Sequence, residues 1–171
     1  WMTAYPLLVF PALFEEKVIY HGLPEANVKG LKVCAGNECL TIGSKPEQLL
    51  EGIAEGVTTF TSRSIDGPYS FIVGPKLWSR MSAHVQGYPV KMQAESILGG
   101  PVLLSPYLSA DFENEAFMLT KRGGDFELIL GQDLAIGYES HSQTKVKLYF
   151  TESFTFRVLE PAAVMNFTAA K

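Results

Sequence analysis

The sequence has little charge and few of the residues that carry chemistry. Of its 171 residues, 19% are charged, the formal net charge is -4, and only two cysteines and three histidines occur. Lysine and arginine form no basic run, which a nucleic-acid-binding surface needs in order to neutralise phosphates. We therefore expect no nucleic-acid partner.

Long hydrophobic runs are also missing. The longest apolar stretch is residues 5–14, and it is interrupted by Pro6 and Pro11. A membrane-spanning helix needs roughly 20 apolar residues. The stretch also lacks the charged start and the small-residue cleavage site of a signal peptide. These absences predict a cytoplasmic protein with no membrane partner.

No common catalytic or metal-binding constellation occurs in the sequence. The histidines are isolated from one another, which favours solvated or capping roles: His21, His84 and His141. Three acidic residues in one polar segment favour a solvated loop: Asp111, Glu113 and Glu115. We therefore predict a structural protein, not an enzyme, with no catalytic residue, no metal ligand and no cofactor site.

The apolar content of 47% is enough for a hydrophobic core. The central part predicts a small α/β unit, and the C-terminal part predicts antiparallel strands. Expected helices cover residues 11–20, a segment beginning at Pro46 and capped by Ser44 and Glu47, 75–83 and 89–98. Expected strands cover residues 69–73, 102–104, 117–121, 126–130, 134–139 and 146–158. The last is far longer than the usual five or six residues, which suits an elongated subunit, and Glu152 within it predicts a bulge or an ion pair.

The two cysteines lie in residues 31–42, which we predict to form a hairpin around Gly36 and Asn37. In that register Cys34 and Cys39 face each other, so two reduced thiols and a strained bridge are both open alternatives. The cytoplasmic prediction favours the reduced thiols.

Several ordered segments carry a resemblance to a known family: residues 16–22, 28–31, 46–51, 66–69, 123–139, 147–158 and 160–163. The segment Gly123–Glu139 is the most specific of them. Together they resemble the shell proteins of encapsulins, also catalogued as linocin-type bacteriocins. The family's N-terminal helix and extended loop have no recognisable counterpart in this sequence.

The resemblance implies an α+β structure with the tailed-phage major capsid fold. Residues 1–22 and 107–171 would form the peripheral domain, with its long antiparallel sheet, and residues 23–106 the axial domain. It also implies self-assembly into an icosahedral shell. The cargo would be a ferritin-like protein or a dye-decolourising peroxidase, bound through a short targeting peptide.

The resemblance implies two surface sites as well. A loop lining the fivefold pore would consist of Gln86, Gly87, Tyr88 and Pro89. A pocket for the cargo-targeting peptide would include Asp133, Ile136, Tyr138 and Glu139. Two alternatives stay open: a viral major capsid protein of the same fold, which the acidic charge disfavours, and a protease, which the missing nucleophile and metal set disfavour.

Overall fold

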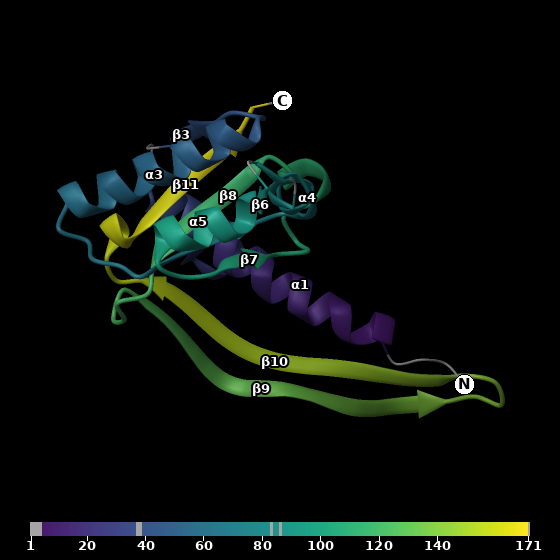
Figure 1. The fold of residues 1–171 in the computed structure, drawn as a ribbon. Coiled ribbons are helices and arrows are strands. Elements are labelled where there is room, and N and C mark those ends of the chain that lie inside the picture. Colours follow the sequence, from purple (N-terminus) through teal and green to yellow (C-terminus); the bar gives the residue numbers. More distant parts are fainter. Residues whose placement is uncertain (1–4, 37–38, 83, 86, 171) are drawn as a thin grey trace.

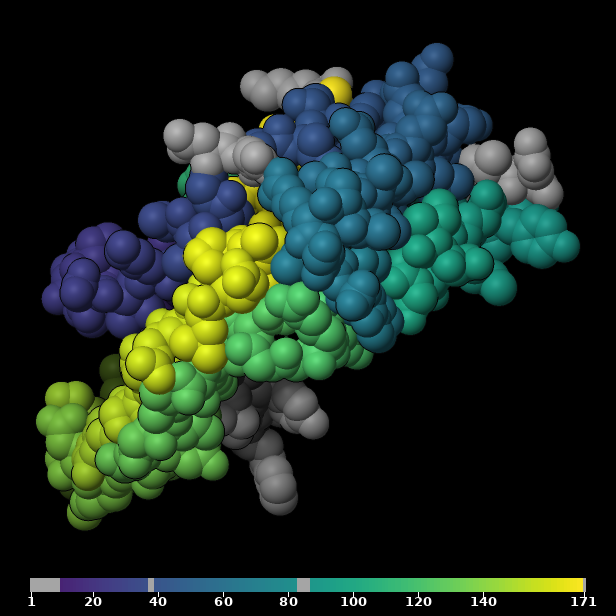
Figure 2. Space-filling model, turned by 90° about the vertical axis from the view of Figure 1, so that its left-hand side faces the viewer, coloured from purple at the N-terminus to yellow at the C-terminus, as the bar shows by residue number. Residues whose placement is uncertain are grey.

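The computed structural model describes residues 5–36, 39–82, 84–85 and 87–170, which form a body and an arm (Figure 1). The arm consists of two long strands, β9 (Phe126–His141) and β10 (Val146–Val158), with helix α1 (Tyr5–His21) beside them. The body is a five-stranded sheet covered by helices. From another side, the light-green arm extends away from the blue helix α3 (Pro46–Ser62) of the body (Figure 2).

The other elements are short. The remaining helices are α2 (Leu31–Cys34), α4 (Pro75–Met81) and α5 (Val90–Leu98), with 3-10 turns η1 (Pro24–Ala26), η2 (Ala110–Phe112) and η3 (Pro161–Ala163). The remaining strands are β1 (Gly22–Leu23), β2 (Val28–Lys29), β3 (Cys39–Ile42), β4 (Tyr69–Val73), β5 (His84–Val85), β6 (Tyr88–Pro89), β7 (Val102–Leu104), β8 (Glu115–Thr120) and β11 (Val164–Ala169).

The sheet of the body has the order β3-β11-β8-β4-β7. The pairs β3/β11 and β4/β7 are parallel, and the other two pairs are antiparallel. Strand β4 is buried along its whole length. This burial on both faces explains why its sequence is a nearly continuous apolar run instead of an alternating one.

Each face of the sheet carries its own hydrophobic core, because successive residues of a strand point to opposite faces. Phe71 and Val73 of β4 pack with α3, α4 and α5, whereas Ile72 packs with the end of α1 and with α2. Phe156 of β10 joins the second core and is 7% exposed. The arm is thereby attached to the body through the second core.

Helix α3 lies close to the sheet because glycines face it. A Cβ on Gly56 would lie 2.7 Å from Cζ of Phe167, which is too short for an ordinary contact. The predicted capping pair of Ser44 and Glu47 is wrong by one residue: the Lys45 N–H donates to Oε1 of Gln48 at 3.3 Å. Pro46 occupies the first helical turn, which makes Lys45 the N-cap.

The long strand β10 has the predicted bounds, but β9 is one strand where we expected two. The strand continues through residues 131–133, where Gln132 pairs with Ser153 and the extra residues of β9 fall at register shifts on either side of that pair. A further shift follows Lys147. The predicted bulge at Glu152 is confirmed. Bulges bend the strand that contains them, and the hairpin is visibly curved (Figure 1).

The predicted hairpin over residues 31–42 is wrong. Its first half is helix α2, and its second half, β3, pairs in parallel with β11, so Cys39 lies opposite Asn166. The expected turn residue Asn37 lies outside the described residues. Cys34 and Cys39 are both free, and partial burial raises the pKa of the Cys34 thiol. A partner strand about 130 residues away in the sequence leaves no local signal.

Two other elements also differ from the prediction. Helix α1 begins at Tyr5 and includes Pro11, so it is longer than the predicted residues 11–20. Strand β11 was not predicted at all, although it lies between β3 and β8. The sheet also mixes the two expected domain ranges, because β8 and β11 come from residues 107–171 and pair with strands from residues 23–106.

Candidate functional site

The residues expected to line a pore lie on a small hairpin. Strands β5 and β6 pair with Val85 opposite Tyr88, and Gly87 in the turn has a φ of +84°, which glycine adopts without strain. Tyr88 is 64% exposed, and its carbonyl accepts a hydrogen bond from Nε2 of Gln93. Gln86 lies outside the described residues, and Pro89 is half-buried. The hairpin therefore presents Gly87 and Tyr88 at the surface of the body.

The residues expected to bind a cargo peptide all lie on β9. Ile136 pairs with Phe150 and Tyr138 with Leu148, so these side chains share one apolar face of the hairpin. Ile136 and Tyr138 are both more than half exposed. Asp133 lies at the bulge opposite Glu152, where its Oδ1 accepts from the Leu134 N–H at 2.8 Å.

Glu139 does not join this face. It is the extra residue at the register shift between Lys147 and Leu148, and its carboxylate pairs with Nζ of Lys147 at 2.8 Å. Lys147 points to the opposite face from its neighbour Leu148, because side chains alternate along a strand. The structure thus brings Ile136 and Tyr138 to one side of β9, places Glu139 on the other, and puts Asp133 at the bulge beside Glu152.

A cleft of about 370 Å³ lies between α1 and this apolar face. Its walls are largely aromatic: Phe10, Pro11 and Phe14 of α1 face Leu134, Phe150, Thr151, Glu152 and Phe154 of the hairpin. The rings of Phe14 and Phe154 meet edge to face with their centroids 6.4 Å apart. Leu134 places the cleft directly beside the expected peptide residue Asp133.

Carboxyl groups meet at the same cleft. Glu152 lines it, and the side chain of Glu15 on α1 is within hydrogen-bonding reach of Glu152. Burial, the charge and hydrogen bond of Glu15, and the charge of Asp133 together raise the pKa of Glu152. Each of these effects disfavours the ionised form. The arrangement places two carboxyl groups beside an apolar surface and favours the neutral form of Glu152.

The end of α1 is attached to the body by a polar cluster. Oε2 of Glu16 accepts from the Ser105 hydroxyl at 2.8 Å and from the Tyr107 N–H at 3.1 Å. His21 lies between two partners, with Nε2 2.9 Å from Oε2 of Glu115 and Nδ1 3.0 Å from the Tyr107 hydroxyl. Of the two roles predicted for His21, solvated or capping, these contacts make the solvated one wrong, and His21 lies in the last turn of α1.

Glu115 is likewise not a solvated loop residue. It begins β8, and its second oxygen accepts from Nζ of Lys32 at 2.7 Å. Burial opposes its ionisation, but the hydrogen bonds from His21 and Lys32 outweigh burial and hold the pKa of Glu115 below its usual range. Glu113, from the same predicted loop, pairs with Lys76.

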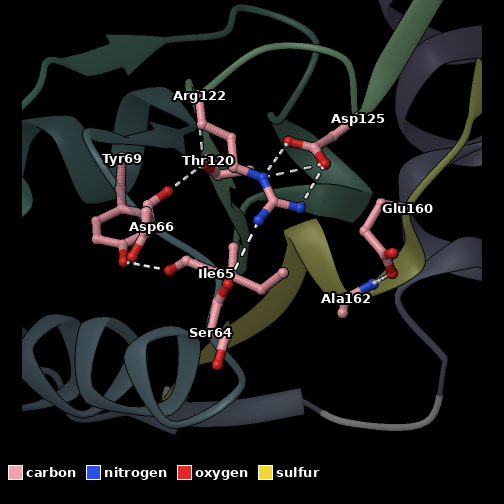
Figure 3. A network of polar contacts seen from close by, with 9 residues as sticks. All are labelled: Ser64, Ile65, Asp66, Tyr69, Thr120, Arg122, Asp125, Glu160 and Ala162. Carbon is pink, nitrogen blue, oxygen red and sulfur yellow. Dashed lines mark hydrogen bonds and ion pairs between the residues drawn. The ribbon is translucent and has the colours of Figure 1, made fainter.

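A second polar network fixes the base of the hairpin (Figure 3). The Arg122 guanidinium donates to both carboxylate oxygens of Asp125, the shortest contact being 2.8 Å, and reaches the Ser64 carbonyl at 3.4 Å. The Asp125 carbonyl accepts from the N–H groups of Leu159 and Glu160. The strands β9 and β10 are therefore joined where they leave the body.

Within the described part of the chain, no group of three His, Cys, Asp or Glu side chains could hold a metal ion. No helix there combines the length and the apolar character needed to cross a membrane. What the geometry offers instead is contact surface: an apolar arm with a cleft, and a projecting hairpin.

A family model described as "Encapsulating protein for peroxidase" matches residues 11–155. The chain belongs to the encapsulin shell-protein family. The type 1 encapsulin shell protein of Rhodococcus erythropolis is 33% identical over 156 residues, which are 91% of this chain and 57% of that protein. This encapsulin-family chain thus spans a little over half the length of the curated relatives it matches.

Solved structures agree on the fold of this encapsulin-family chain. The capsid of Myoviridae Phage XM1 matches with a TM-score of 0.66 at 12% identity, covering 97% of this chain and 65% of that one. A virus-like particle from Pyrococcus furiosus matches with a TM-score of 0.63 at 15% identity, covering 80% and 58%. These likenesses confirm the predicted α+β tailed-phage major capsid fold.

The sequence pattern did not reveal that α1 forms one wall of the cleft beside the β9–β10 hairpin. Phe10 and Phe14 are four residues apart, which places them on one side of a helix, and this spacing was the available signal. Pro6 and Pro11 concealed it, because proline in a helix interior usually breaks the helix.

Proposed function

We propose that this chain is a structural subunit that associates with copies of itself into a closed shell around cargo protein. The exposed apolar arm carries the proposal. Large side chains on it are 40–65% exposed: Leu128, Ile129, Leu130, Ile136, Tyr138, Val146, Leu148 and Tyr149. These side chains lie on both faces of the hairpin, and exposed apolar surface of this kind is typical of protein contact sites. Neighbouring copies in a shell would cover it.

The separation of the molecule into a body and an arm supports an assignment of two domains. We assign the body, including β8 and β11, to the axial domain, and the arm with α1 to the peripheral domain. This differs from the ranges expected from the sequence, since the two strands are paired within the body sheet. A density map of an assembled particle tests the assignment through the positions of body and arm relative to the symmetry axes.

Assembly is tested by negative-stain electron microscopy combined with light scattering. We expect hollow particles of uniform mass from the unaltered chain. The double substitution Val146→Lys and Leu148→Lys should abolish them without unfolding the chain, because both side chains are about half exposed or more. The matched control Val33→Lys, which is 59% exposed on α2, should still assemble. A monomeric unaltered chain, or unaffected assembly of the double variant, would contradict the proposal.

The cleft beside Asp133 is our candidate for the cargo-peptide pocket. Aromatic walls suit apolar peptide side chains, and Asp133 offers a polar group that would set the direction of the peptide. Co-expression with a ferritin-like protein or a dye-decolourising peroxidase, each with and without its C-terminal tail, tests this. Ile136→Asp should reduce co-purification of the tailed cargo, whereas Val33→Asp, at an exposed position on α2 away from the arm, should not.

The β5–β6 hairpin is our candidate for the pore lining, because Gly87 and Tyr88 are exposed at its tip. The same density map should place this hairpin at the fivefold axis. A hairpin buried between neighbouring subunits, away from any axis, would contradict the assignment.

A further inference from the structure

The arm meets the body at α1 through a cluster of directional contacts that we call the joint: Glu16, Tyr20, His21, Lys32, Ser105, Tyr107, Phe112, Glu115 and Phe117. Three of these residues belong to the last turns of α1. Glu16 and Tyr20 are four positions apart and share one side of the helix. All the others come from the body, so the joint links two parts of the molecule that could otherwise move relative to each other.

The aromatic part of the joint is buried and layered. Tyr20 is 7% exposed and stacks between Tyr107 and Phe117, with ring centroids 6.0 and 5.3 Å away. Burial, together with the nearby charge of Glu16, raises the pKa of Tyr20 to about 12, against a smaller opposing effect of its hydrogen bond with Ser105. Its hydroxyl therefore stays protonated and stays a hydrogen-bond donor.

The hydrogen bonds of the joint form together in one orientation of α1 relative to the body. Nε2 of His21 and the Glu115 carboxylate form one hydrogen bond, and because the carboxylate can only accept, Nε2 is the donor. Nδ1 of the same ring forms a second hydrogen bond with the Tyr107 hydroxyl at 3.0 Å. The His21 ring also lies against Phe112, with centroids 4.2 Å apart. A rotation of α1 would break these contacts together and leave half-buried polar groups unpaired, which is unfavourable.

The backbone that follows α1 is tightly constrained. Gly22 has a φ of +85°, and a Cβ on Gly30 would lie 2.4 Å from the Gly22 nitrogen, so the backbones of β1 and β2 touch directly behind the helix end. The second attachment, at Asp125, fixes the base of the hairpin. The direction of the arm is therefore defined at two separate points.

We propose that the joint sets the angle between arm and body, and that His21 and Tyr107 are positioning residues that determine the curvature of the shell. This rests on the proposed shell function. In a closed assembly of identical chains every contact recurs, so an error in one angle is repeated in each copy and closure at a single size is lost. Directional hydrogen bonds are suited to fixing such an angle, whereas apolar packing alone tolerates sliding.

The test compares Tyr107→Phe and His21→Ala with the unaltered chain. Tyr107→Phe removes only the hydroxyl and keeps the ring stack, and His21→Ala removes both hydrogen bonds of the imidazole. Lys91→Gln is the matched control, since it breaks the Lys91–Glu95 ion pair of α5 far from the joint. We expect both joint variants to lose the single particle diameter in electron micrographs, while the control keeps it.

Melting temperature separates positioning from simple destabilisation. We expect Tyr107→Phe to change it by less than about 4 °C, so that a change in particle size at nearly unchanged stability marks a positioning role. Particles of one unaltered diameter from both variants would overturn the proposal. If His21→Ala fails to fold, Tyr107→Phe alone decides.

Small-angle X-ray scattering from the unassembled chain tests the joint without the shell. We expect a larger radius of gyration or a broader distance distribution for the joint variants than for Lys91→Gln. If the unaltered chain forms no particles, the shell function fails. In that case, identical scattering curves for all variants would also overturn the proposal that the joint sets the arm angle. Scattering curves that differ between the joint variants and Lys91→Gln would support it.

Discussion

Phe154 and Phe156 should differ sharply in their contribution to stability, although both lie on the same face of β10. From alternation alone, each Phe→Ala substitution would be expected to cost about 3 to 5 kcal/mol. In the structure the two side chains differ in burial. Phe156 is 7% exposed and packs in the second core of the body, whereas Phe154 is half-buried and contacts Phe14 across the cleft.

The burial gives the magnitudes. Phe156→Ala should cost about 3 kcal/mol, because it leaves a cavity under the sheet. Phe154→Ala should cost about 1 to 2 kcal/mol, from roughly half the buried area and one edge-to-face ring contact. Leu148→Ala is the control on the same face, and at 46% exposed it should cost less than about 1 kcal/mol.

Urea denaturation followed by far-UV circular dichroism measures these differences, and thermal melts should show a fall of about 6 to 12 °C for Phe156→Ala. The curves should be recorded at several protein concentrations, since assembly adds concentration-dependent stability. Equal effects of the two substitutions, or a larger effect of Phe154→Ala, would refute the assignment of Phe156 to the body core.

Three further outcomes follow from the packing and the charges. Gly56→Ala should cost about 1 to 3 kcal/mol in urea melts, because the new methyl meets Phe167. The pKa of Glu152 is raised in the folded chain, so acidification from ~pH 7 to ~pH 5 should raise the melting temperature relative to Glu152→Gln, in which the repulsion by Glu15 is gone. The pKa of Glu115 is lowered, so its stabilisation is present above ~pH 5 and lost below, and Glu115→Gln should show a weaker acid dependence than the unaltered chain. Parallel pH profiles of variant and unaltered chain would contradict either statement.

Local patterns predicted the elements whose partners lie nearby or whose faces differ strongly. The alternation in residues 146–158 predicted β10 to the residue, and the apolar run of residues 69–73 predicted β4. Helix α3 followed from its apolar stripe, and only its cap was misplaced by one residue. The family resemblance and the capsid fold were also predicted from the sequence, because the motifs that carry them are local stretches of residues in a fixed order and do not require knowledge of tertiary contacts.

What the tertiary structure alone decided is where distant segments meet. Strand β3 forms only with β11 as its partner. The Glu115 carboxylate is hydrogen-bonded to His21 and Lys32, and not to solvent alone, because α1, α2 and β8 meet at this point. The sequence by itself determined the family and elements such as α3, β4 and β10, since hydrophobic periodicity and turn chemistry are local properties. Burial, hydrogen-bond partners and shifts in pKa depend on neighbours far along the chain, so the cleft and the joint became visible only in the fold.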